Sequence, residues 1–292
     1  MRSEVLEEMP EAIMEYFCEQ VLKRDWPNCI HAYYFIKNAF QWMRKNSASS
    51  YKLYYISNDV ENGTFIGILS RPEEEYPDVV VTYTCPGNEE QFRRMLFSTE
   101  YINWQKKPLF QAIPFRMKAI VETMIEEKGL KSKLYSNAVL KWMPADVAAR
   151  LDYEIPEDVF IDQLSVDHID FIYSLWSHSD VYPKSDLWDT VRLNIGLGVF
   201  NRHNGELLAW AMCGSYGGLS TLIVQPDYRG RGFGKLIVLA VTKVMGENGV
   251  SPHALINEKN KVSLGLFKNV GYVKHSTPLP YVVVEDPDTS GP

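Results

Sequence analysis

The chain has 292 residues, of which 46% are hydrophobic and 13% aromatic, so it is long and apolar enough for two domains, each with its own core, and is not a disordered chain. Its formal net charge of −7 excludes the general basic character of a nucleic-acid-binding protein. The four cysteines form no C-x-x-C pair and the six histidines have no metal-ligand spacing, so neither disulfides nor a bound metal are expected.

No apolar run reaches the ~18 residues of a membrane span. The first 19 residues carry six glutamates and a single arginine, which is unlike a signal peptide or a mitochondrial presequence. We therefore expect a cytoplasmic protein without a membrane partner. The composition leaves the oligomeric state open.

The N-terminal half is expected to contain both helices and strands. Residues 4–23 show helical spacing of apolar side chains, and Asn62-Gly63 is typical of a turn between strands. The expected order is helices at 4–23 and 28–44, strands at 51–58, 63–70 and 79–84, helices at 89–106 and 114–127, and a strand at 133–140.

A domain boundary is expected within 144–156, which has two prolines and no clear periodicity. It divides the chain into an N-terminal α/β domain, 1–150, and a second domain, 151–292. In the second domain a strand at 159–164 precedes a helix that Ser165 or Asp167 would cap. The expected elements after it are a helix at 186–194, a hairpin of 197–201 and 207–213, a strand at 219–224, a long helix, a strand near 254–257, another helix, and a last strand at 281–285.

The most informative stretch is 219–235. Leu219 to Val224 has the apolar, β-prone composition of a buried strand, and Pro226 ends it because proline has no N–H for a ladder. Three glycines follow at every second position, with two arginines between them, and then an apolar stripe with helical spacing. A helix N-terminus entered through glycines offers unpaired N–H groups and partial positive charge, which favours phosphate.

The glycine spacing distinguishes this loop from two better-known phosphate loops. No G-K-[ST] follows at the Walker A distance, and the third glycine of the dinucleotide-binding G-x-G-x-x-G is missing.

The stretch resembles the acyl-CoA loop of the GNAT N-acetyltransferase superfamily, whose pattern is Arg/Gln-x-x-Gly-x-Gly/Ala. Here Arg229 to Gly234 matches it, entered through Val224, Pro226 and Tyr228. A second block follows in family order after the strand at 254–257: Asn260, Ser263, Leu266, Phe267, Lys268, Gly271 and Tyr272 match N-x-x-S/A-x-x-L-Y-x-K-x-G-F/Y. The resemblance extends over about 159–284.

The resemblance implies an α/β (α+β) GNAT fold, with a mixed central sheet flanked by helices. The N-terminal half contains no second Arg-x-x-Gly-x-Gly. It is either a degenerate copy of the C-terminal half or an unrelated α/β cap. Its element order favours the copy, giving a two-lobed chain similar to the glycine N-acyltransferase-like proteins.

The activity implied by the resemblance is direct transfer of an acyl group from a thioester to an amine. Acetyl-CoA or another acyl-CoA would be the co-substrate, its pantetheine arm pairing with a strand edge and its pyrophosphate lying on the loop amides. The residues that the resemblance assigns to acyl-CoA binding are Leu222, Ile223, Val224, Arg229, Gly230, Arg231, Gly232, Phe233, Gly234, Lys235, Asn260, Phe267 and Lys268.

The acid and base that assist such a transfer are harder to place. The tyrosine that often serves as the acid is replaced by Phe267, which leaves Ser263 and Tyr272 as candidates. The alternative for Tyr272, and the favoured one, is a place in the packing of a final strand. The glutamate of glycine N-acyltransferase-like enzymes is replaced by Gly218. The base is then sought among Tyr216, His253 and Glu258, or in a chain of waters.

Four aromatic side chains fall where the acceptor would bind in this fold: Trp176, His178, Tyr182 and Trp188. The first hypothesis is an N-acyltransferase acting on a small amine or amino acid. The alternatives are a catalytically silent CoA-binding or scaffold protein and, less favoured, a protein N-acetyltransferase. A small-molecule amine is thus the expected partner, with no nucleic acid.

Overall fold

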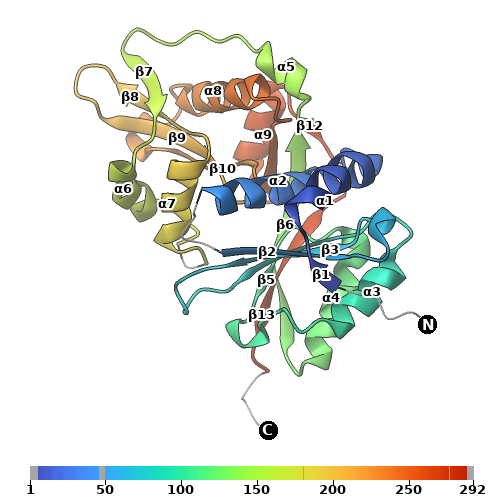
Figure 1. The fold of residues 1–292 in the computed structure, drawn as a ribbon. Coiled ribbons are helices and arrows are strands. Elements are labelled where there is room, and N and C mark those ends of the chain that lie inside the picture. Colours follow the sequence, from blue (N-terminus) through green and yellow to red (C-terminus); the bar gives the residue numbers. More distant parts are fainter. Residues whose placement is uncertain (1–5, 46–49, 180, 276, 288–292) are drawn as a thin grey trace. The chain divides into compact units, whose positions relative to one another are not determined.

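The computed structural model describes residues 6–45, 50–179, 181–275 and 277–287 (Figure 1). It divides the chain into two compact units. Unit 1 comprises Met1–Ala138 and Thr277–Pro292, and unit 2 comprises Val139–Ser276. The division precedes the boundary expected at 150 and returns the C-terminal residues to unit 1.

Unit 1 is built on a mixed sheet. Its strands run in the order β1-β2-β3-β4-β5-β13-β6, with β4 and β5 parallel and the other neighbours antiparallel. The strands are β1 (Leu6–Glu8), β2 (Ser50–Ile56), β3 (Phe65–Ser70), β4 (Val79–Tyr83), β5 (Leu109–Phe110), β6 (Lys131–Trp142) and β13 (Leu279–Glu285). The helices are α1 (Glu11–Tyr16), α2 (Ile30–Arg44), α3 (Glu89–Ser98) and α4 (Phe115–Glu127), with a π-helical turn at Phe17–Val21.

The predicted helix at 4–23 is wrong at its start. Positions 4 and 5 lie outside the described residues, and Leu6–Glu8 pairs with β2 as a short strand. Pro10 separates this strand from α1, because it stands as the N-cap with extended backbone angles. The two-residue strand β5 was not predicted from the sequence.

The predicted last strand of the second domain forms, but it pairs in unit 1. β13 is antiparallel to β5 and to β6, with Val282 opposite Phe110 and Leu279 opposite Ala138. Val282 and Val284 are buried in a core shared with α3 and α4. The apolar side chains of Val282 and Val284 are therefore buried in the core of unit 1.

Unit 2 contains an antiparallel sheet of order β10-β9-β8-β7. These strands are β7 (Val159–Gln163), β8 (Gly196–Asn201), β9 (Leu207–Cys213) and β10 (Leu219–Val224). A second group consists of β11 (His253–Asn257), the end of β6 and β12 (Val273–Lys274), in which Lys274 pairs with Lys141. The helices are α5 (Ala145–Ala149), α6 (Ile169–Ser174), α7 (Lys184–Leu193), α8 (Phe233–Glu247) and α9 (Lys261–Val270).

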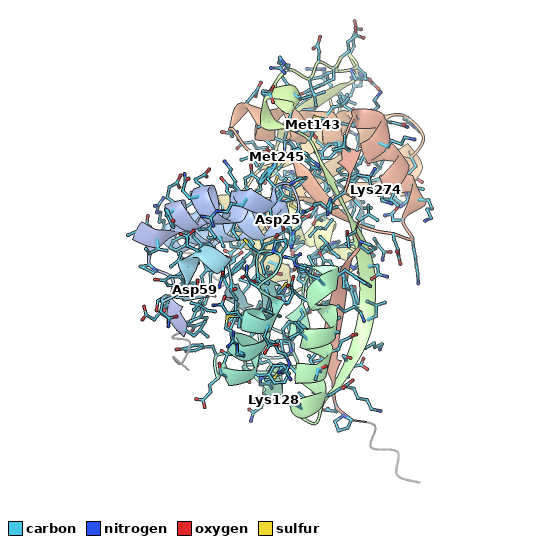
Figure 2. The ribbon with its side chains drawn as sticks, turned by 90° about the vertical axis from the view of Figure 1, so that its right-hand side faces the viewer. Asp25, Asp59, Lys128, Met143, Met245 and Lys274 are labelled. Carbon is cyan, nitrogen blue, oxygen red and sulfur yellow. The ribbon has the colours of Figure 1, made fainter. Side chains whose placement is uncertain are left out.

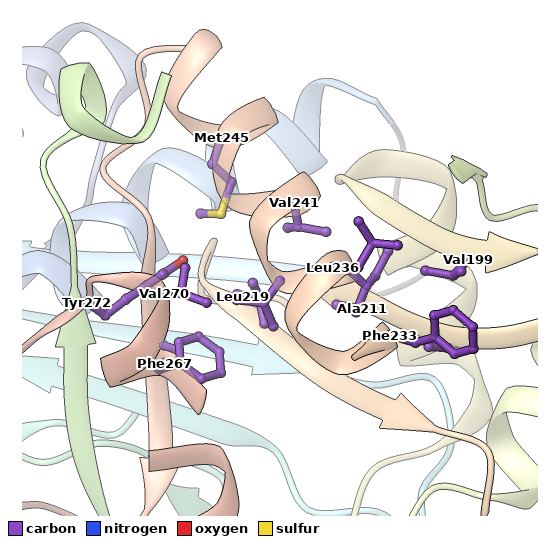
Figure 3. Close-up of a cluster of buried hydrophobic side chains, with 14 of the residues drawn as sticks. Val199, Ala211, Leu219, Phe233, Leu236, Val241, Met245, Phe267, Val270 and Tyr272 are labelled. Carbon is purple, nitrogen blue, oxygen red and sulfur yellow. The ribbon is translucent and has the colours of Figure 1, made fainter. Parts of the chain in front are cut away.

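The two faces of the unit 2 sheet bury different helices. Trp210 and Met212 of β9 lie in a core with α6 and α7. Their neighbours Ala209 and Ala211 lie in the core formed with α8 and α9, part of which Figure 3 shows. Alternate residues of a strand point to opposite faces, so helices cover both sides of this sheet. The predicted fold class, a mixed central sheet flanked by helices, is confirmed.

Candidate functional site

Strand β10 has an irregular register where the acyl-CoA arm is expected. Ser220 lies opposite Met212 and Ile223 opposite Trp210, so β10 holds one residue more than β9 across this interval. Thr221 has φ of +45°, a region that β-branched residues rarely adopt. This β-bulge changes the direction of the backbone groups that follow.

The other edge of β10 faces β11. The two strands lie next to each other, yet among the described residues no ladder joins them, since β11 pairs in the other strand group. Strands that separate in this way leave backbone N–H and C=O groups for an added strand. Leu222, Ile223 and Val224 lie on this segment and are half-buried.

The glycine loop leads from β10 into α8. Gly230 and Gly232 have φ of +77° and +86°, which favours glycine, and a Cβ built at either meets no heavy atom within 4 Å. Gly232 is the N-cap of α8, and its carbonyl accepts the N–H groups of Lys235 and Leu236, both at 3.0 Å. The first-turn amides of Phe233 and Gly234 have no acceptor within the helix.

This loop fits a phosphate group in the way the resemblance implies. The space beside its glycines is open, and the first turn of α8 adds partial positive charge. The Lys235 amide already donates to the Gly232 carbonyl. The amides that suit an anion are therefore those of residues that precede Lys235.

The two loop arginines stabilise the loop by hydrogen bonds and also give it positive charge. Arg229 Nε donates to Val224 O at 3.3 Å, and Arg231 Nη2 donates to Asp227 O at 3.1 Å. The Arg231 guanidinium also lies 5.1 Å from the ring centroid of Tyr228. The Tyr228 hydroxyl donates to Glu206 at 2.8 Å, which raises the pKa of Tyr228. Both arginines are exposed, so they add positive charge in reach of an anion.

The second family block begins at the N-terminus of α9. Asn260 is its N-cap, and the Asn260 Oδ1 accepts the Ser263 N–H at 3.0 Å. This hydrogen bond fixes the orientation of the Asn260 carboxamide, including its NH₂ group. The Asn260 side chain is exposed. Ser263 and Glu258 are half-buried, and the Glu258 carbonyl accepts from Lys261 Nζ at 2.7 Å.

Phe267 and Tyr272 lie in the core, which for Tyr272 is the packing role that the sequence favoured (Figure 3). Their exposed fractions are 2% and 3%, and their ring centroids are 4.9 Å apart. The Tyr272 hydroxyl is 2.7 Å from Thr242 Oγ1, and burial raises the pKa of Tyr272 far above its usual range. Both the burial and the contact with Thr242 make Tyr272 a packing residue in this structure. Lys268, the next residue after Phe267, is exposed.

The base candidates next to Gly218 are also buried. The Tyr216 hydroxyl donates to Leu219 O at 2.9 Å, and burial raises the pKa of Tyr216. His253 is fully buried, and burial lowers its pKa to about 4, with Nδ1 3.1 Å from Ser251 O. A Cβ at Gly218 would lie 2.2 Å from the Tyr216 ring and 2.8 Å from His253. With the Tyr216 and His253 rings in these positions, a side chain at position 218, such as the glutamate expected of glycine N-acyltransferase-like enzymes, has no room.

Three of the four aromatic acceptor candidates lie together after α6. The Trp176 ring centroid is 5.6 Å from that of Tyr182 and 6.4 Å from that of His178. Trp188, on α7, is 44% exposed and makes no ring contact with this trio among the described residues.

The bulge at Thr221 was not predicted, although the sequence carries a trace of it. Leu219, Leu222 and Val224 all reach the core that contains α8, and Ile223 reaches the opposite core. A regular strand would send Leu219 and Leu222 to opposite faces, so their three-residue spacing signals an extra residue.

Two negative findings concern the described residues. No group of three or more His, Cys, Asp or Glu side chains within them is arranged to hold a metal ion. None of the helices within the described ranges combines the length and apolar character that crossing a bilayer requires.

Comparisons with known proteins agree with this arrangement. Residues 196–279 match the family model of FR47-like proteins, and residues 5–124 match a domain of unknown function, DUF5645. A search of curated proteins gave no match. A Drosophila protein solved by a structural genomics consortium is similar over 96% of this chain and 98% of its own, with a TM-score of 0.85 and 19% identity.

Two further structures share the fold at lower similarity. A tandem GNAT protein of the clavulanic acid biosynthesis pathway, described without AcCoA, gives a TM-score of 0.56 at 12% identity over 97% of this chain and 100% of its own. A proposed acetyltransferase from Pyrococcus horikoshii gives 0.55 at 12% identity over 98% and 91%. The chain thus has the fold of tandem GNAT proteins, and its residues 196–279, which include the glycine loop, are similar to the FR47-like family.

Proposed function

We propose that this chain is an N-acyltransferase that moves the acyl group of acetyl-CoA, or of another acyl-CoA, directly to the amine of a small molecule or amino acid. The observation that carries the proposal is the continuity of one segment: a bulged strand with a free edge, β10, runs through an open glycine loop into the first turn of α8. These features, in this order, suit a thioester with a diphosphate tail.

The chain's own groups then have distinct tasks. The free edge of β10 at Leu222 to Val224 pairs with the amides of the pantetheine arm, and an N–H there polarises the thioester carbonyl. The amides of Phe233 and Gly234, with Arg231, hold the diphosphate. The amine nitrogen bonds to the thioester carbon, the C–S bond breaks, the amine loses a proton and the thiolate gains one.

The proton path does not use the buried residues. Tyr216, His253 and Tyr272 are enclosed in the core, while Ser263 and Glu258 are only half-buried. We assign the proton transfers to solvent-connected groups, of which Ser263 and Glu258 are the candidates from the sequence. Gly218 in place of the glutamate weakens the case for glycine conjugation more than it weakens the case for acyl-CoA binding.

The comparisons support acyl transfer at the level of the fold. The segment that matches FR47-like proteins includes both β10 and the glycine loop. The four cysteines of the chain are buried free thiols, which suits a reducing compartment. We therefore propose that the protein is located in the cytoplasm.

A second candidate is a protein that binds acyl-CoA without catalysis. It is favoured by two observations, the burial of Tyr272 and the closed space at Gly218, which leave neither of these positions open for an acid or a base. A peptide acceptor, as in a protein N-acetyltransferase, is the third.

Two assays on matched variants separate these functions. Isothermal titration with acetyl-CoA is expected to show binding that Arg231→Glu weakens about tenfold or more, because a charge beside the diphosphate is reversed. Arg192→Glu, the same reversal on α7, is expected to leave the affinity unchanged. Release of free CoA thiol with a panel of small amines tests turnover.

Each result has a definite meaning. Turnover that Arg231→Glu abolishes supports the transferase. Binding without turnover on any amine or peptide supports the silent protein. Absence of binding, or equal weakening by both variants, contradicts acyl-CoA binding at this loop.

A further inference from the structure

Unit 2 contains a pair of lysines that no carboxylate of the described residues neutralises. Lys141 on β6 and Lys274 on β12 are direct partners in an antiparallel ladder. Residues directly opposite each other in such a ladder have Cβ atoms about 5 Å apart, and like charges there repel. Lys274 is exposed (labelled in Figure 2), whereas Lys141 is only 6% exposed.

Lys141 is a buried cation without a counter-ion. Within the described ranges no carboxylate lies within ion-pair distance of Lys141 or Lys274, and no hydrogen bond is made by the Lys141 ammonium. Lysine is almost never buried unless it is paired. Burial, followed by the charges of Lys274 and Lys268, lowers the pKa of Lys141.

A third lysine, Lys268, adds positive charge near Lys141 and Lys274. Met143, two residues after Lys141, lies in the core with Phe267 and Val270 of α9. Lys268 stands in the last turn of that helix and is exposed.

The helix end does not account for these charges. Cations near a helix C-terminus are favourable when they meet its free carbonyls. Here Gly271 N–H donates to Lys268 O at 3.1 Å and Tyr272 N–H donates to Phe267 O at 3.0 Å, so these carbonyls are already satisfied by the backbone.

We propose that Lys141 and Lys274, assisted by Lys268, form a binding site for a phosphate group. Three ammonium groups suit a phosphate dianion better than a single carboxylate, because lysines act as point charges on phosphate and need no planar geometry. The phosphate belongs either to inorganic phosphate or a small phosphate monoester, or to the 3′-phosphate of CoA. The second source rests on the proposed function, and the first does not.

The test measures thermal and urea unfolding of the full chain in phosphate and in chloride of equal ionic strength. Phosphate is expected to raise the midpoint of the wild-type protein. Lys141→Met is expected to be more stable than wild type in chloride, since it removes a buried unpaired charge, and to bind phosphate about tenfold or more weakly. Lys274→Glu provides an internal counter-ion opposite Lys141 and is expected to abolish the response to phosphate.

The control is Lys52→Met, which removes an exposed lysine of β2 and is expected to retain the full phosphate response. The proposal is overturned if wild type shows no phosphate-specific shift, or if Lys141→Met keeps that shift. A purely structural Lys141 would instead make Lys141→Met less stable in both salts.

A second arm identifies the source of the phosphate. If the site holds the 3′-phosphate of CoA, saturating CoA removes the response to added phosphate and 3′-dephospho-CoA does not. If the ligand is separate, the response persists in the presence of CoA. Failure of CoA to bind at all contradicts the proposed function and leaves the phosphate response of the lysine pair as an independent result.

Discussion

Gly218 shows how one residue limits the chemistry around it. The Tyr216 and His253 rings close over it, with centroids 5.6 Å apart, and both rings are buried. The Tyr216 and His253 rings occupy the space that a side chain at position 218 would need, so their burial depends on the glycine. The acyl transfer that we propose would therefore depend on backbone groups and solvent-connected side chains.

Gly218→Glu tests this packing. Because a Cβ would lie 2.2 Å from Tyr216, we expect the variant to lose roughly 2–3 kcal/mol of unfolding free energy and to gain no activity. Urea unfolding and thiol release measure the two effects. A stable variant with faster acyl transfer to glycine would contradict the account.

His253 gives the stability of the chain a specific pH dependence. Its pKa is about 4 in the folded protein, against a usual value near 6.5. Below pH 6.5 the unfolded chain gains a proton at this residue that the folded chain does not take up until about pH 4, so stability falls as the pH is lowered through that window.

We expect this pH dependence of stability to be absent from His253→Gln. The difference in unfolding free energy between wild type and variant should change by on the order of 3 kcal/mol between pH 7.5 and 4, in the direction that disfavours wild type at low pH. Denaturant titrations across that range measure it. A difference that is constant with pH would show that burial does not shift this histidine.

At the scale of elements, the strand, loop and helix of 219–247 form the segment that we propose binds acyl-CoA. Gly232 ends the loop in the left-handed region, and that conformation directs the first amides of α8 outward. Gly205 offers a matched comparison, since it has φ of +73° in the β8–β9 turn and a Cβ there also meets no heavy atom within 4 Å.

Gly232→Ala and Gly205→Ala should therefore separate strain from binding. Each is expected to cost about 1 kcal/mol of stability, because a side chain at positive φ is strained. Only Gly232→Ala is expected to weaken acetyl-CoA binding, several-fold or more, as seen by calorimetry. Equal effects on affinity would mean that the loop conformation is not part of the site.

The sequence predicted this segment better than its details. The elements of this segment follow from local composition and spacing, and the sheet flanked by helices is what the family resemblance implies. The bulge at Thr221, the burial of Phe267 and Tyr272 and the pairing of Lys141 with Lys274 depend on which strands meet and in which register. No local pattern contains that information, although the spacing of Leu219 and Leu222 hints at the bulge.

At the scale of the whole molecule, the chain exchanges strands between its units. The end of β6, from the first half of the sequence, pairs with β12 in unit 2, and β13, from the C-terminal end, pairs in the sheet of unit 1. A sequence divided at one boundary cannot show such an exchange, which is why β13 was assigned to the second domain.

Val282→Asp tests the exchange. Val282 is fully buried, so we expect a loss of about 3 kcal/mol or more and faster amide exchange in β5 and β6 of unit 1. Val273→Asp, on β12 at 51% exposure, is the control and should change stability by no more than ~0.5 kcal/mol. Loss of protection confined to β7–β10 would contradict the assignment of β13.

The most direct test of acyl-CoA binding is amide hydrogen exchange of the wild-type chain with and without saturating acetyl-CoA. We expect slower exchange at 222–224, at 230–234 and near Asn260, with no comparable change in α3 or α4 of unit 1. Protection that excludes the glycine loop, or no protection in the presence of bound acetyl-CoA, would contradict the account.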